Sequence, residues 1–169
     1  MNNKIVQNNP IPSPIHRGIA WWIGTVGGIG RSPVAPGTCG SLVALPMAWA
    51  IAALFGEKWL LLAIAIMFFI GWICSSIVSR QMVDHDPQEI IIDEVVGQWI
   101  ALLFVPFNWH WYIVAFVFFR LFDIIKPWPI NEAEKRFQNG FGIMIDDVIA
   151  GIFALISTQA IYLIVSLFQ

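Results

Sequence analysis

The chain has 169 residues, of which 58% are hydrophobic and 12% are charged, and its formal net charge is −2. A soluble domain usually has about 25% charged residues, so this chain lacks the polar surface that would cover a core in water. A weakly negative chain also cannot neutralise a run of phosphates, which argues against a nucleic-acid binder. Composition therefore predicts an integral membrane protein.

The N-terminal part of the chain differs from the rest. Residues 1–17 are polar and rich in proline, and we expect a disordered tail there. Residues 18–169 are predicted to form one membrane-embedded domain. This domain opens with an apolar run, 19–30, which is too short to span a bilayer and is typical of a re-entrant or interfacial segment.

Five longer apolar stretches follow, and we expect about four to five of them to cross the membrane as a compact all-α bundle. They are residues 38–55, 59–79, 90–107, 109–125 and 143–168. The first has small residues at four-residue spacing, Gly40, Ala44 and Ala48, which predicts a close helix contact. The polar residues 131–140, between the last two stretches, predict a loop.

Charge is distributed unevenly between the two sides of such a bundle. Eight of the nine Lys and Arg residues fall on the side of the N-terminus, and Lys58 is the exception. The positive-inside rule makes that side cytoplasmic. Ten of the eleven Asp and Glu residues lie there too, with Glu57 as the exception. Because acids are not sorted by that rule, their clustering predicts a functional site.

Five of these carboxylates lie within about one turn of the cytoplasmic ends of their helices. They are Asp93, Glu94, Asp123, Asp146 and Asp147. Carboxylates in apolar spans are costly and repel one another unless a cation holds them together. Capping could explain either adjacent pair, but Asp123 lies at a helix C-terminus, where an anion is disfavoured. We therefore predict that all five are catalytic.

The metal expected at this cluster is Mg²⁺, which binds carboxylate oxygens together with phosphate oxygens. Its predicted ligands are the two adjacent pairs, Asp93 with Glu94 and Asp146 with Asp147. Asp86, in the polar segment 80–89, is predicted to assist the site from further away.

Cationic side chains accompany the acids on the same side. Arg120, Asp123 and Lys126 are spaced by three residues and share one face of their helix. They could form an internal ion pair with a snorkelling lysine, or a clamp for a phosphate. Arg31 precedes a helix whose N-cap would be Thr38, and free N–H groups there are also suited to phosphate binding.

Four segments contain most of these residues: GRSPVAPGTCGS (30–41), DPQEIIIDEVVGQWIAL (86–102), FRLFDIIKPWPI (119–130) and GFGIMIDDVIAGI (140–152). Together they resemble the motif blocks of the bacterial phosphatidylglycerophosphatase A family, in the same order, from about residue 24 to 152. The resemblance implies a Mg²⁺-dependent phosphatase of the bacterial plasma membrane. Such an enzyme hydrolyses phosphatidylglycerophosphate to phosphatidylglycerol and phosphate.

The residue pattern agrees with this chemistry, because phosphoryl transfer depends mainly on positioning and charge neutralisation. In this hypothesis the acids and Mg²⁺ orient a water molecule, and an aspartyl nucleophile is the other route. A cation- or proton-coupled transporter is the alternative function, since intramembrane acids also mark ion paths. Transport sites usually lie near the midplane of the membrane, however, whereas these acids lie near one face.

Overall fold

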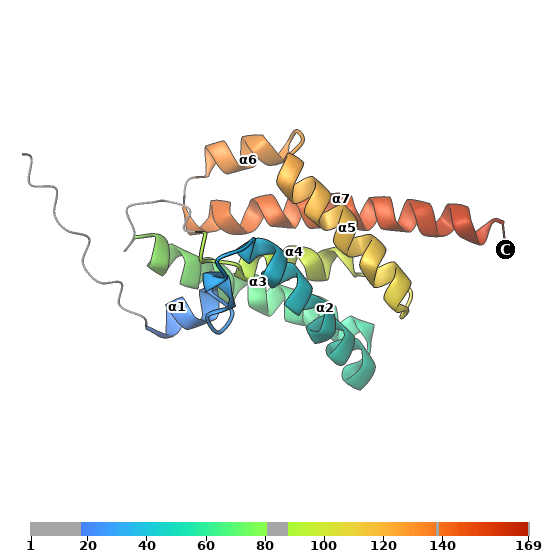
Figure 1. Ribbon diagram of the computed structural model, residues 1–169, viewed down its shortest axis with the longest axis horizontal. Coiled ribbons are helices and arrows are strands. Elements are labelled where there is room, and N and C mark those ends of the chain that lie inside the picture. The colour runs from blue at the N-terminus through green and yellow to red at the C-terminus, as the bar shows by residue number, and fades with distance from the viewer. Residues whose placement is uncertain (1–17, 81–87, 138, 169) are drawn as a thin grey trace, which may run out of the picture.

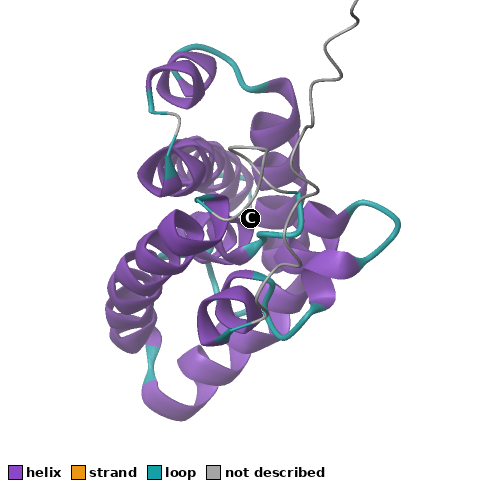
Figure 2. Ribbon diagram, turned by 90° about the vertical axis from the view of Figure 1, so that its left-hand side faces the viewer, coloured by secondary structure: helices purple, strands orange, loops and turns teal. Residues whose placement is uncertain are grey.

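The computed structural model describes residues 18–80, 88–137 and 139–168, so the predicted tail and Asp86 lie outside the described residues. Within these ranges the chain is entirely helical, with seven α-helices and one 3₁₀ turn (Figures 1 and 2). The elements are α1 (Ile19–Gly24), η1 (Ile29–Arg31), α2 (Pro36–Phe55), α3 (Glu57–Ser79), α4 (Ile92–Ala101), α5 (Trp109–Ile125), α6 (Ile130–Arg136) and α7 (Gly140–Ser166).

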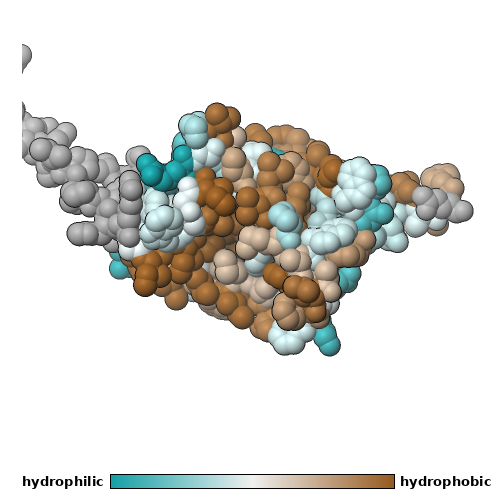
Figure 3. All heavy atoms as spheres, turned by 60° about the horizontal axis from the view of Figure 1, so that its bottom comes forward, coloured by the Kyte–Doolittle hydropathy of each residue, from teal (hydrophilic) through white to brown (hydrophobic). Residues whose placement is uncertain are grey.

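The predicted all-α membrane protein is confirmed. Three of the described helices, α2, α3 and α7, are long and apolar enough to cross a membrane. The helix α5 has the predicted bounds and 17 residues, slightly fewer than these three. Hydrophobic side chains cover the middle of the face shown in Figure 3, with more polar residues toward its two ends. This pattern suits a bundle surrounded by lipid between two polar layers.

The prediction of one helix over 90–107 is wrong at its C-terminal end. The helix α4 has ten residues and ends at Ala101, so it is only about 15 Å long. Beyond it Phe104 adopts a positive φ of 58°, and Pro106 has no N–H for a helical hydrogen bond. Asn108 then caps α5 by accepting a hydrogen bond from the His110 N–H. The chain therefore turns before α4 becomes long enough to cross the membrane.

The short helix α4 lies inside the bundle, where it contacts α2, α3, α5 and α7 (Figure 1). Eight of its ten residues are buried, and the two that are partly exposed are Asp93 and Glu94. The acids predicted to lie on a spanning helix thus lie on a helix that is enclosed by protein.

The predicted loop over 131–140 is also wrong in part, because residues 130–136 form the helix α6. Its first residue, Ile130, is fully buried, and the helix packs against α7. On its exposed face Lys135 Nζ lies 4.0 Å from Glu132 Oε1, an i, i+3 pair that supports a helix weakly. The polar composition of these residues does not distinguish a short helix from a loop.

The apolar run 19–30 does not span the bundle. Its first part is the six-residue helix α1, which packs against α3. Trp21 Nε1 donates a hydrogen bond to Glu89 Oε2 at 3.2 Å, and the Ile91 N–H donates to the Gly24 carbonyl at 2.9 Å. The short helix is thereby attached to the segment that leads into α4.

Small residues allow the central helices to touch. Gly40, Ala44 and Ala48 are all buried, as their spacing predicted. A second contact joins α4 to α7, where a Cβ on Gly151 would collide with the backbone carbonyl of Gly97. The two backbones therefore meet within about one turn of Asp147.

We expect Gly151→Ala to destabilise the protein by about 1–3 kcal/mol, because a backbone atom cannot move aside for the added methyl group. The measurement is the midpoint of thermal unfolding in detergent. Gly24→Ala is the matched control, since its added Cβ would lie 3.9 Å from the nearest atoms of Ile90, an ordinary contact. Equal midpoints for the two variants would contradict the backbone contact between α4 and α7.

Candidate active site

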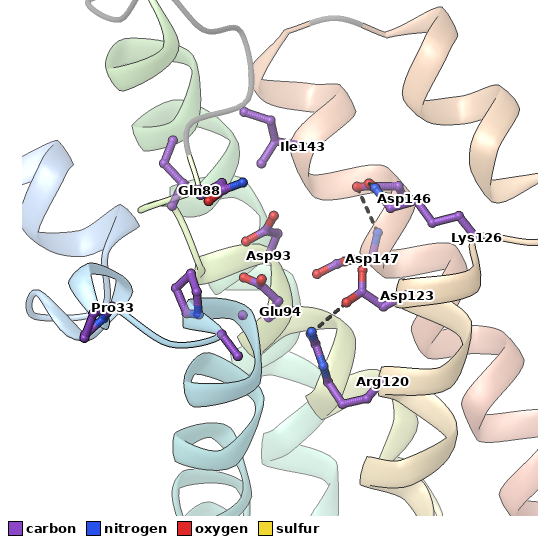
Figure 4. Close-up of a pocket in the computed structure, with 14 residues that line it drawn as sticks. Pro33, Gln88, Asp93, Glu94, Arg120, Asp123, Lys126, Ile143, Asp146 and Asp147 are labelled. Carbon is purple, nitrogen blue, oxygen red and sulfur yellow. Dashed lines mark hydrogen bonds and ion pairs between the residues drawn. The ribbon is translucent and has the colours of Figure 1, made fainter.

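A cavity of about 460 Å³ opens at the end of the bundle where α7 begins. Its charged lining comes from α4, α5 and α7, and its remaining wall includes the start of α2. The charged residues that line it are Asp93, Glu94, Arg120, Asp123, Lys126, Asp146 and Asp147 (Figure 4). The structure thus brings all seven of these predicted site residues together.

Three carboxylates form the acidic side of this cavity. Asp93 and Glu94, in the first turn of α4, point toward Asp147 of α7 (Figure 4), and each offers an oxygen within 4.8 Å of the other two. Asp147 is only 3% exposed. Its Oδ2 and the buried Glu94 Oε2 have no hydrogen-bond partner among the described residues. Buried carboxylate oxygens without donors are unfavourable unless a cation neutralises them, so this donor set fits a divalent metal ion.

Asp146 lines the same cavity but has different partners. Its Oδ2 accepts a hydrogen bond from Lys126 Nζ at 2.8 Å, and its Oδ1 accepts one from the Asp147 N–H at 3.1 Å. Adjacent residues on an α-helix point about 100° apart, so only one of the two can face α4 directly. Asp147 does so, and Asp146 faces the end of α5; the metal-ligand role of Asp146 stays a prediction.

Arg120 and Asp123, both on α5, line the cavity next to Asp147 (Figure 4). Arg120 Nη1 lies 2.7 Å from Asp123 Oδ2, and the two side chains are 15% and 14% exposed. The same Nη1 lies 3.4 Å from Ser41 Oγ of α2. The internal ion pair considered from the sequence is therefore present. Because the guanidinium is also a lining group of the cavity, the phosphate clamp stays a compatible prediction.

The start of α2 supplies the backbone wall. This helix begins at Pro36, and the predicted N-cap Thr38 is wrong, because Ala35 occupies that position with a left-handed φ of 46°. No described side chain caps the helix, and Pro36 and Gly37 line the cavity. Arg31 is exposed in η1, and neither it nor Thr38 lines the cavity. Their phosphate-binding roles stay predictions.

Gly37 was not singled out by sequence reasoning, although it lies within the Gly/Pro-rich segment that was predicted to approach a phosphate. A Cβ at this position would collide with Glu94 Oε1 and would lie 3.2 Å from Arg120 Nη1. Glycine therefore leaves room at the start of α2 for the Glu94 carboxylate and the Arg120 guanidinium, and a larger residue would displace the carboxylate. The sequence does show a Pro-Gly pair directly ahead of a predicted helix. This pair does not reveal which side chains pack against the glycine.

Fold and cavity together define a class: a membrane-embedded protein whose acids and arginine are arranged for phosphate chemistry. The family model for Phosphatidylglycerophosphatase A matches residues 22–162 of this chain. The chain therefore belongs to this family and is an enzyme, a phosphoric monoester hydrolase. Membership favours this activity over the transporter considered as the alternative.

Individual relatives support the same assignment. The chain is 39% identical to a phosphatidylglycerophosphatase A of Haemophilus influenzae, over 93% of this chain and 97% of that protein. It is also 39% identical to the Escherichia coli protein of that name, over 85% and 83%. A Bacteroides thetaiotaomicron protein described as a putative phosphatidylinositol-3-phosphatase is 41% identical over 79% and 87%. No solved structure gives a significant match.

Proposed function

We propose that this enzyme hydrolyses phosphatidylglycerophosphate to phosphatidylglycerol and phosphate, with Mg²⁺, at the cytoplasmic face of a bacterial plasma membrane. The observation that carries the proposal is the three-carboxylate cluster facing the Arg120–Asp123 pair in one cavity. The names of the Haemophilus influenzae and Escherichia coli relatives support the choice of lipid.

The cavity suggests a division of labour among the side chains. Asp93, Glu94 and Asp147 would hold Mg²⁺, which on binding supplies positive charge at the phosphate and activates a water molecule. Arg120, oriented by Asp123, donates two hydrogen bonds to the phosphate oxygens. The N–H groups at the uncapped start of α2 add donors on the same side.

Lys126 contributes a second cation at the mouth of the cavity. Its Nζ is held by Asp146 at 2.8 Å, so it acts as a positioned point charge rather than a freely moving side chain. A phosphate bound in the cavity would have two cations in the wall around it, Lys126 and Arg120.

A cytoplasmic orientation is supported by the distribution of charge along the bundle. The start of α7 and the helix α6 lie at one end, whereas the α2–α3 turn with Glu57 and Lys58 lies at the other (Figure 1). The cavity belongs to the first end, because residues at the start of α7 line it. Among described cations only Lys58 belongs to that opposite end. The positive-inside rule then directs the cavity toward the cytoplasm.

Phosphatidylinositol 3-phosphate is the second candidate substrate, favoured by the name of the Bacteroides thetaiotaomicron relative. Both lipids are phosphomonoesters on a membrane headgroup, so the same acids and arginine serve either. They differ in the group that bears the phosphate, a glycerol in one and a bulky inositol ring in the other.

The decisive assay measures phosphate release by the purified chain from mixed micelles that contain one lipid phosphate at a time. We expect release from phosphatidylglycerophosphate with Mg²⁺, none in EDTA, and recovery when Mg²⁺ is restored. Faster release from phosphatidylinositol 3-phosphate would favour the second candidate. Undiminished activity in EDTA would contradict the metal requirement. Protein with the Asp147→Asn substitution, purified in the same way, is the control for contaminating phosphatases.

A further inference from the structure

Gln98 is a buried polar residue that the chemistry described so far does not use. It lies in α4, its exposed fraction is 0%, and neither its amide nitrogen nor its amide oxygen has a hydrogen-bond partner among the described residues. A glutamine amide offers both donors and an acceptor, and such groups are normally paired when buried. An apolar side chain of the same size would fill this position with no unpaired atom.

Two neighbouring groups have unpaired atoms of the complementary kind. Glu94 precedes Gln98 by four residues, so the two side chains share a face of α4, and the buried Glu94 Oε2 is an acceptor without a donor. Arg120 Nε is a buried donor without an acceptor. The Gln98 Nε2 group is thus a donor suited to the Glu94 carboxylate, and the Gln98 Oε1 atom is an acceptor suited to the Arg120 guanidinium.

The residues on either side of Gln98 contact the helices α5 and α2. On one flank, a Cβ at Gly97 would collide with the ring of Phe119, the residue before Arg120. On the other flank, Trp99 Nε1 donates to the Ala44 carbonyl of α2 at 3.0 Å. Arg120 Nη1 approaches the preceding turn of α2 at Ser41 Oγ. Gln98 therefore lies where α4 contacts α5, which carries Arg120, and α2, which Arg120 contacts.

We propose that Gln98 is a positioning residue for Arg120. As charge develops on the phosphate in the transition state, the Gln98 Nε2 group donates to Glu94 Oε2 and its Oε1 atom accepts from Arg120 Nε. With Nε held from behind and Nη1 held by Asp123 and Ser41, the Nη2 group of the guanidinium faces the phosphate. The inference rests on the proposed function, which makes Arg120 a phosphate ligand.

The first test is Gln98→Met, which keeps the length of the side chain and removes its donor and acceptor. We expect kcat to fall about tenfold or more while KM changes by about twofold or less, since an interaction used in the transition state is lost. The unfolding midpoint should stay unchanged or rise, because two unpaired buried atoms disappear. The matched control is Thr158→Val in α7, another fully buried polar residue with an unpartnered oxygen and outside the cavity.

The second test repeats Gln98→Met in an Arg120→Lys background, where no Nε atom exists. The proposal predicts less than about a twofold further loss of kcat, because the two residues act through one contact. A Gln98→Met enzyme that keeps more than half of its kcat would overturn the inference, and so would an equal tenfold loss in both backgrounds.

The unchanged chain, assayed in parallel, separates this inference from the proposed function. If it releases phosphate from none of the lipids, the proposed function fails and the role of Gln98 fails with it. If it is active and Gln98→Met is equally active, only the role of Gln98 is overturned.

Discussion

Replacing Asp147 by asparagine is expected to lower phosphate release by about a thousandfold or more, the largest effect of any single change in this chain. Asparagine keeps the shape of the side chain but removes the negative charge from the only cluster of three acids identified among the described residues as able to hold a metal ion. Loss of a metal that stabilises charge in the transition state removes several kcal/mol of barrier lowering, and each 1.4 kcal/mol corresponds to a factor of ten.

The measurement is the initial rate of phosphate release at saturating Mg²⁺ and lipid. The control is Glu132→Gln, which changes an acid of α6 whose side chain is 63% exposed and which does not line the cavity. The double variant Asp93→Asn with Asp147→Asn should be little worse than the single one, because ligands of one metal act as a unit. A single variant that kept a tenth of the activity would argue against this cluster as the metal site.

The second large effect is expected for Arg120→Lys, which should lower kcat/KM about a hundredfold. The guanidinium is planar and presents several donors at once, so it can hold Asp123 and Ser41 while it also faces a phosphate. A lysine ammonium at this position keeps the charge but lacks the two-pronged geometry. The expected loss therefore reflects geometry and not net charge.

This prediction is checked by the ratio kcat/KM for the preferred lipid, together with the unfolding midpoint of each variant in detergent. Lys135→Ala is the control, since that side chain is 69% exposed, lies 4.0 Å from Glu132 and does not line the cavity. If Arg120→Lys matched the unchanged chain, charge alone would suffice and the clamp would be wrong.

The bounds of the long helices could be predicted closely because the sequence signals that mark them are local. The helix α5 has the predicted ends, and α3 begins two residues before its prediction, since charged residues, prolines and glycine mark these boundaries. The end of α4 was missed because residues 102–105 are as apolar as the helix itself, and hydropathy does not report a positive φ at Phe104. Pro106 was the one sequence signal that the helix ends in this region.

The sequence predicted which residues gather at the site, but it did not predict which of them contact one another. Acids at the end of three helices were bound to meet once the helices packed side by side. Which of Asp146 and Asp147 faces α4 depends on the rotation of α7, and the close contact of Gly97 with Gly151 fixes that rotation. Gly37 was not predicted for a similar reason. A glycine has no side chain, so its role is evident only when the residues packed against it are known.

The enclosed position of α4 governs how the site comes into being as the chain is synthesised. At about 15 Å this helix cannot cross a bilayer unaided, and it is covered by α2, α3, α5 and α7. The helix α7 leaves the ribosome last among them, and it brings Asp147 and the glycine that contacts α4. Asp93 and Glu94 therefore lack their third partner until α7 inserts, and a chain stalled on the ribosome before Gly140 does not contain the three-carboxylate cluster.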